Sequence, residues 1–267
     1  MRSYAAIIGA RFRALLQYRA AALGGLFTQI AFGLTRLMIL EAFYRSSTAA
    51  QPMSLAEGVG YVWLGQATLL LVPWRPDADV AQQIRTGTIA YELARPLDLY
   101  AVWFARAVAG RTAPVLLRML PMFVVAMLLV PSGWRLAPPP SLAAAALWLA
   151  TFGGSVLLSS AITALMSVSM LWTVSAQGVP LLLANLATFG SGLVIPLPLF
   201  PGWARVALQA LPFAGMLDLP ARVYTGNIAA ADAGWVLAHQ LAWVVALAAL
   251  GRWLLGRGLR RVVVQGG

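Results

Sequence analysis

Long apolar runs separated by short polar segments cover most of this chain and predict a bundle of membrane-spanning helices. The runs lie at about residues 23–44, 58–74, 112–130, 142–172, 179–195 and 233–251. Each approaches or exceeds the ~20 residues that an α-helix needs to cross ~30 Å of hydrocarbon. We therefore expect an all-α membrane protein with six transmembrane helices in a single domain over residues 1–267.

The first 20 residues predict a helix that lies on the membrane surface instead of crossing it. Four apolar side chains share one helical face: Tyr4, Ile8, Phe12 and Leu15. Such a stripe is typical of an interfacial helix. Arg11 and Arg19 interrupt the pattern, and we expect their long stems to carry the charges out to the head groups. Arginines also break any signal-peptide core, so residues 1–20 should be retained.

A proline-rich stretch after the fifth apolar run predicts that the chain turns back on the outer side. Pro196, Pro198 and Pro201 fall close together and must end the preceding helix. The sequence that follows is only weakly amphipathic and contains further prolines. We expect residues 196–232 to form short helices that dip into one interface as an outer re-entrant segment.

Small polar residues recur at four-residue spacing in the fourth apolar run: Ser155, Ser159, Thr163 and Ser167. On a helix they would form one ridge, which favours close packing against a neighbouring helix. A role of this ridge in lining a substrate path is an alternative that the sequence leaves open.

Residues 75–111 form a polar segment that interrupts the apolar pattern, with five arginines and four acidic residues. A connector between two spans needs only a few residues. Gly87 permits a bend, and Pro96 cannot continue a helix. Asp98 is placed to cap a helix that begins near Leu99. We therefore expect short helices at the membrane surface in this segment.

The distribution of charge predicts how the chain is oriented. The net charge is +11, and all 19 basic residues are arginine. With six spans, thirteen arginines fall on the side that holds both termini and the polar segment, and four fall on the other side. Basic loops stay in the cytoplasm, so we expect both termini there, in a bacterial cytoplasmic (inner) membrane. The basic excess then faces the lipid bilayer, and no nucleic-acid partner is expected.

Missing residue types exclude several kinds of chemistry. The chain has no Cys and no Lys. A Walker loop needs a lysine that reaches the β- and γ-phosphates, so this chain cannot hydrolyse ATP by such a loop. Thiolate metal sites are excluded as well. We assign no catalytic residue and no metal ligand.

Charged residues inside the first apolar run are candidates for a translocation path, because charge is costly in a bilayer. Arg36 and Glu41 lie roughly 140° apart around a helix and do not form a helical ion pair. Arg36 either faces a neighbouring helix or an aqueous cleft, or it snorkels. Glu41 lies near the outer end, where snorkelling accounts for it. A secondary transporter is an alternative function, for which Glu41 would be the one intramembrane carboxylate available to a coupling ion.

An intramembrane serine hydrolase is a further alternative. Ser191 in "FGSGLV" and His239, the only histidine, would be the nucleophile and the general base. The G-x-S-G arrangement of intramembrane serine proteases needs glycine at position 189, where Phe189 stands. The sequence therefore favours this alternative least.

Part of the polar segment, "IRTGTIAYELARPLDLY", resembles the signature G-x-(I/L)-x-x-x-L-x-R-P-(L/V) of ABC type-2 transporter permeases. Five residues carry the match: Gly87, Ile89, Leu93, Arg95 and Pro96. Farther on, "PLPLFPGWARVALQALPF" and "PARVYTGN" resemble the family's segment between the fifth and sixth spans. The chain thus resembles this family in its motif and in the order of its spans.

The resemblance implies the permease subunit of an ATP-driven exporter. Residues 75–111 would be a cytoplasmic coupling segment that docks into a separate ATPase subunit, which would hold ATP and Mg, so that this chain needs no cofactor. Two ATPase copies would act on two permeases, the second identical or paralogous. The coupling residues would be Arg85, Gly87, Ile89, Glu92, Leu93, Arg95, Pro96 and Asp98. Among these, Ile89 and Leu93 would form the apolar anchor.

Overall fold

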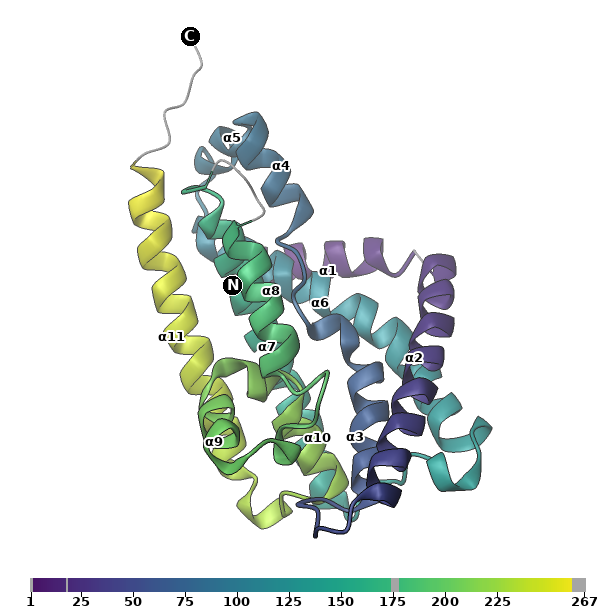
Figure 1. The fold of residues 1–267 in the computed structure, drawn as a ribbon. Helices are drawn as coiled ribbons and strands as arrows, with labels where there is room; N and C mark the ends of the chain where they lie inside the picture. Colours follow the sequence, from purple (N-terminus) through teal and green to yellow (C-terminus); the bar gives the residue numbers. More distant parts are fainter. Residues whose placement is uncertain (1, 18, 174–177, 261–267) are drawn as a thin grey trace.

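Helices make up the regular structure of residues 2–17, 19–173 and 178–260, which the computed structural model describes. Four stretches in this part of the chain are long and apolar enough to cross a membrane: Gly24–Ser46, Leu99–Leu129, Leu142–Ser169 and Ala230–Leu259. The first stretch is part of α2 (Arg19–Ser46), and the others contain α6 (Leu99–Val124), α7 (Leu142–Ser169) and α11 (Gly234–Leu259). These four helices form a bundle (Figure 1). The expected all-α, multi-pass membrane fold is therefore confirmed.

Two of the six expected spans are too short to cross a bilayer as helices. α3 (Leu55–Ala67) and α8 (Gly178–Gly190) have 13 residues each. At 1.5 Å per residue each is ~20 Å long, against ~30 Å of hydrocarbon. The expected ends of these spans, Trp74 and Ile195, lie in irregular backbone instead. Helix length therefore supports four spans, although the chain still reverses direction from each of the six helices to the next (Figure 1).

Local sequence sets the bounds of both short helices. A capping box begins α3, in which Ser54 and Glu57 each accept a hydrogen bond from the other's backbone amide. After α3, only the 3-10 turn η1 (Leu69–Leu71) forms before the chain leaves the helical path. α8 ends shortly before Gly192, whose φ of 78° favours glycine.

The polar ridge of α7 is buried and holds irregular backbone in place. Its members bond to four different segments: Ser155 to the Gly215 carbonyl, Ser159 to the Leu71 carbonyl, Thr163 to the Arg111 side chain and Ser167 to the Asp77 amide. Non-helical backbone is tolerated at membrane depth only where the protein satisfies its polar groups. The ridge therefore supplies hydrogen bonds to irregular segments as well as close packing.

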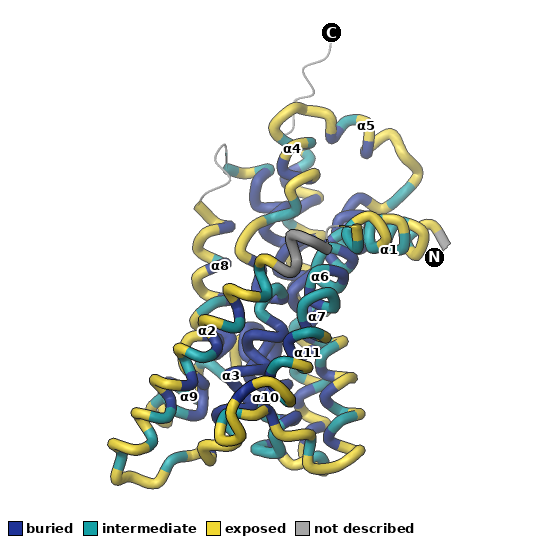
Figure 2. The backbone as a smooth tube through the Cα atoms, turned by 90° about the vertical axis from the view of Figure 1, so that its right-hand side faces the viewer, coloured by how far each residue is buried: buried dark blue, intermediate teal, exposed yellow. Residues whose placement is uncertain are grey.

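Helix α1 (Arg2–Leu15) lies across the bundle and packs against α6 (Figures 1 and 2). The four apolar residues of its expected face are all partly buried. Arg11 differs from the expectation, because its guanidinium reaches Asp77 and Asp79 at 2.8 and 2.6 Å instead of the head groups. The Arg19 side chain lies outside the described part of the chain.

Short helices follow α8 toward the lower end of the molecule in Figure 1, as expected for residues 196–232. They are η4 (Leu197–Leu199), α9 (Gly202–Ala210), η5 (Pro212–Met216), α10 (Asp218–Thr225) and η6 (Ala230–Asp232). α10 packs against both α3 and α7. The outer segment is therefore an integral layer of the bundle and not a loose loop.

Asp218, at the start of α10, is a buried carboxylate that the sequence pattern did not indicate. Its side chain is fully buried and accepts a hydrogen bond from the Tyr61 hydroxyl at 2.9 Å. The Arg222 guanidinium lies 3.6 Å away, one helical turn later. Glu41 is therefore not the only carboxylate enclosed by the bundle, and Asp218 joins the outer segment to α3.

Replacing Asp218 with alanine should strongly destabilise the protein. The change leaves the largely buried Arg222 without its carboxylate, and breaking a buried ion pair costs about 3–5 kcal/mol. The thermal unfolding midpoint of the purified protein should fall well below that of Asp232→Ala, which alters an exposed carboxylate of the same outer segment. Equal midpoints for the two variants would contradict this role of Asp218.

Candidate coupling site

The expected coupling segment forms a bent pair of short helices at one end of the molecule (Figures 1 and 2). The helices α4 (Ala78–Thr86) and α5 (Ile89–Leu93) meet at Gly87, and we call residues 77–98 the elbow. Gly87 has a φ of 74°, and nothing lies within 4 Å of where its side chain would begin. Glycine is therefore needed here for the backbone conformation and not for space, as the expected bend requires.

The elbow is shorter than the expected segment at residues 75–111. Asp98 caps α6 by accepting a hydrogen bond from the Ala101 amide at 2.7 Å, so α6 begins at Leu99. The predicted cap is confirmed, whereas the helix after it begins well before the expected third span. Residues 99–111 are the first turns of α6 and not part of a polar connector.

Two of the expected coupling residues, Ile89 and Glu92, face the rest of the chain instead of a partner. Ile89 is 2% exposed and packs in an apolar cluster with Trp103. Glu92 is 8% exposed and accepts hydrogen bonds from Arg106, from the Trp103 indole at 3.3 Å and from Gln83 at 3.1 Å. Ile89 and Glu92 are therefore not accessible for the docking contacts that we expected of them. Both side chains instead bind the elbow to residues of α6.

The remaining coupling residues are exposed on the elbow: Arg85, Gly87, Leu93, Arg95, Pro96 and Asp98. Leu93 is 42% exposed, and Tyr91, which the motif does not include, is 75% exposed. Within the described residues, neither Arg85 nor Arg95 forms an ion pair. Tyrosine and arginine are enriched among residues that dominate protein interfaces, so the elbow presents an apolar tip beside unpaired cations.

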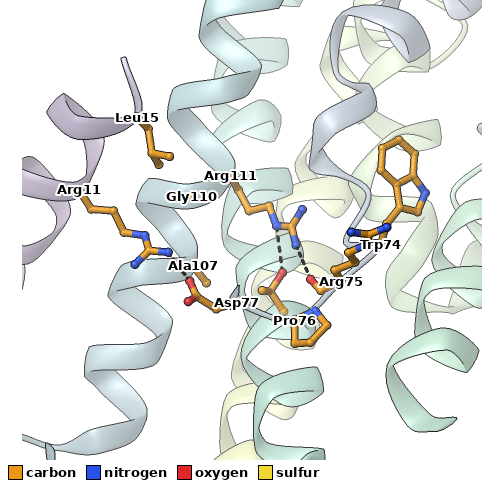
Figure 3. A pocket seen from close by; sticks show the side chains of 10 residues that line it. Arg11, Leu15, Trp74, Arg75, Pro76, Asp77, Ala107, Gly110 and Arg111 are labelled. Atoms are coloured by element: carbon orange, nitrogen blue, oxygen red, sulfur yellow. Dashed lines mark hydrogen bonds and ion pairs between the residues drawn. The ribbon is translucent and has the colours of Figure 1, made fainter. Parts of the chain in front are cut away.

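Arg111 on α6 ties the segment that enters the elbow to the bundle (Figure 3). Its guanidinium donates to the Thr163 hydroxyl at 3.0 Å and to the carbonyls of Leu70, Val72 and Arg75 at 3.4, 3.4 and 3.1 Å. These carbonyls follow α3, where no continuing helix supplies partners. Arg111 thus replaces hydrogen bonds that the short second span lacks.

A cavity of about 580 Å³ opens beside this segment, between α1 and α6 (Figure 3). Arg11 and Arg111 both line this cavity, and the Asp77 side chain faces Arg11 (Figure 3). At the far end of the elbow, Asp98 lies 3.7 Å from Arg252 of α11. The elbow is therefore joined by polar contacts to α1, α6 and α11.

The two charged residues of α2 lie in different surroundings. Arg36 donates to the Leu193 carbonyl at 2.5 Å and lines a cavity of about 340 Å³. Glu41 does not line this cavity, and binds Arg45 at 2.6 Å and the Trp134 indole at 2.9 Å. Of the two expected path residues, only Arg36 therefore faces an internal space.

Ser191 and His239 are not arranged as a nucleophile and its base. The Ser191 hydroxyl is buried and donates to the Thr188 carbonyl of its own helical turn at 3.4 Å. Neither ring nitrogen of His239 has a side-chain partner in the described part of the chain. The geometry gives no support to a serine hydrolase.

A family model described as "ABC-2 family transporter protein" matches residues 31–266. The chain belongs to this family. No curated protein and no solved structure matches the chain. The match confirms the resemblance carried by the elbow motif, and it makes the protein a membrane permease of an ABC transporter. Membership of this family implies association with an ABC ATPase.

The ABC-2 elbow also depends on arginines that its motif does not contain. Arg11, Arg106 and Arg111 lie on α1 and α6 and bind groups in or just before the elbow. Their partners are many residues away in sequence, so no local pattern indicates the pairing. In the sequence, only the closely spaced Asp77 and Asp79 indicate that a cation should lie near the start of α4.

Proposed function

We propose that this ABC-2 permease couples ATP hydrolysis on a separate ATPase subunit to the export of a substrate across the membrane. The exposed elbow with its buried base carries the proposal. Tyr91 and Leu93 are available to a partner, whereas Glu92 is held by Arg106 inside the chain. A partner that grips the tip can therefore move α6, to which the base is tied.

ATP and Mg belong to the ATPase in this proposal, since the permease has no lysine for a Walker loop. Two ATPase copies act on two permeases, the second identical or paralogous, in a bacterial cytoplasmic membrane. Closure of the ATPase pair presses on the elbows, tilts the α6 helices and opens a path to the outside. The elbow and both termini lie in the cytoplasm, and the outer segment at residues 196–232 lies on the other side.

Single-cysteine labelling tests the elbow contact directly, because the natural chain has no cysteine. Tyr91→Cys should react with a membrane-impermeant maleimide in inside-out vesicles, and the cognate ATPase should slow the reaction at least about tenfold. Adding Leu93→Ala should remove most of this protection, because truncating an interface anchor costs ~2 kcal/mol or more, or ~30-fold in affinity.

Matched variants separate docking from general effects. Arg85→Ala removes an exposed charge and should weaken protection less than Leu93→Ala. Arg13→Cys, exposed on α1 away from the elbow, should be labelled equally with and without the ATPase. Equal labelling of Tyr91→Cys in both conditions would show that the elbow is only a solvated connector.

A further inference from the structure

The cavity beside Arg36 has the form of a ligand pocket. It lies between α2, α3 and the irregular backbone after α8, and its volume is about 340 Å³. Ligand pockets have volumes of about 300–1,000 Å³. Apart from Arg36 and Tyr61, the residues that line it are apolar. The cavity therefore combines one positive charge with a hydrophobic wall.

Arg36 carries a charge that the described chain does not neutralise. A guanidinium has five N–H donors, and among the described residues the one acceptor for Arg36 is the neutral Leu193 carbonyl. No ion pair involves Arg36 within the described residues. The free donors of Arg36 are consequently available to an anion in the cavity.

A second copy of the chain does not offer a counter-ion at this depth either. The chain has only eight acidic residues, and all lie in described parts. Three of them are buried or partly buried toward the outer side: Glu41, bound to Arg45 and Trp134, Glu57, bound to the Ser54 amide and Asn227, and Asp218, bound to Tyr61 and Arg222. All three carboxylates are already engaged, so charge complementarity favours a bound anion that is not protein.

The position of Arg36 within the membrane makes its charge costly in free energy, which argues against a purely structural role. It lies near the middle of the candidate span Gly24–Ser46, where an ionised side chain is costly and marks a substrate or ion pathway. Helix α8 ends at Gly190, and the irregular backbone at Gly192 and Leu193 that follows it lines the same cavity. Non-helical backbone at membrane depth is tolerated where it is buried in protein or lines a cavity.

The mouth of the cavity is formed by exposed apolar side chains. Ile39 of α2 is 65% exposed, and Val194 and Ile195 after α8 are 42% and 47% exposed. A molecule with an alkyl chain can therefore enter sideways from the bilayer and keep its chain in apolar surroundings. The chemistry of the cavity calls for an anionic head group on a single apolar chain.

We propose that this cavity binds a single-chain amphiphile with an oxyanion head group, and that such amphiphiles are the substrate class of the permease. The head group pairs with Arg36, and the chain lies along the apolar wall between α2 and α3. The binding step is independent of the elbow, whereas the role of the amphiphile as substrate rests on the proposed function.

Binding of radiolabelled dodecanoate to the purified full-length permease tests the proposal, at pH 8, where the carboxylate is ionised. Arg36→Gln keeps a donor for the Leu193 carbonyl but removes the charge, and it should weaken dodecanoate binding at least about tenfold, because charge-assisted hydrogen bonds are the strong ones. Arg36→Lys keeps the charge and should retain most of the binding. Uncharged dodecan-1-ol should bind wild type and Arg36→Gln alike.

Further variants identify the occupant of the cavity. Ile39→Trp narrows the mouth and should weaken the binding of both dodecanoate and dodecan-1-ol. Equal dodecanoate binding by wild type and Arg36→Gln would overturn the proposal. Efficient cross-linking of Val194→Cys between two permease copies would also overturn it, since a second permease would then fill the mouth.

The two proposals fail separately. Arg36→Gln should leave ATPase protection of Tyr91→Cys unchanged, because the cavity and the elbow share no residue. Dodecanoate binding without ATPase protection at the elbow would contradict the proposed function and still support the binding site. Protection at the elbow without charge-dependent dodecanoate binding would contradict the binding site and still support the proposed function.

Discussion

Replacing Arg111 with leucine should abolish the response of the membrane helices to ATP while the ATPase still docks. The change removes four hydrogen bonds and leaves the carbonyls of Leu70, Val72 and Arg75 without this donor. Each buried group left unpaired costs about 1–3 kcal/mol. The segment between α3 and the elbow should then move freely, so motion of the elbow is no longer passed to α3.

ATP-dependent maleimide labelling of Ile195→Cys, in an otherwise cysteine-free complex, measures this response without knowledge of the substrate. Thr163→Val is the matched control, since it removes one of the four hydrogen bonds of Arg111 and should reduce the response only partly. Protection of Tyr91→Cys by the ATPase should persist in Arg111→Leu. A wild-type ATP response in Arg111→Leu would refute the role assigned to this arginine.

Glu92→Ala should detach the elbow from α6 and abolish docking of the ATPase. Arg106 is largely buried and would lose its carboxylate, and the Trp103 indole would lose its acceptor. Removing one partner of a buried ion pair costs about 3–5 kcal/mol. The thermal unfolding midpoint should fall, and ATPase protection of Tyr91→Cys should disappear.

Replacing both partners distinguishes a structural latch from a direct contact with the ATPase. The double variant Glu92→Leu, Arg106→Leu leaves no charge unpaired and should recover much of the lost stability, because apolar pairs often replace buried ion pairs at little cost. Arg95→Ala, which alters an exposed arginine of the elbow, should leave the midpoint unchanged. Equal midpoints for Glu92→Ala and Arg95→Ala would rule out the latch.

In the proposed mechanism, different residues of the elbow bind the ATPase and transmit its motion. Tyr91 and Leu93 are 75% and 42% exposed on the elbow, whereas Ile89 and Glu92 are buried at its base. In this mechanism, a force on the tip would reach α6 through the Glu92–Arg106 pair and the end of the second span through Arg111. Substitutions at the tip should therefore affect assembly, and substitutions at the base should affect coupling as well.

The elbow was partly predictable from sequence because some of its features depend on neighbouring residues. Gly87 as the bend and Asp98 as the helix cap follow from backbone preference and from hydrogen bonds within three residues. The division of the motif into an exposed and a buried face was not predictable. It depends on where α6 lies, and a helix of five residues such as α5 has too little periodicity to reveal its inner side.

The sequence by itself determined the class of the protein: long apolar runs select membrane helices, because each must satisfy its own backbone hydrogen bonds in hydrocarbon. It also determined the position of the elbow and the short outer helices, since charge, glycine and proline act locally. Only the tertiary structure decided where the second and fifth apolar segments stop being helical and which charges meet. Arg11 and Asp77 are 66 residues apart, and Arg36 and Leu193 are 157 apart. Such pairs form only when the helices pack. A buried polar group without a hydrogen-bond partner costs free energy, so it pairs with whichever group the fold brings near it.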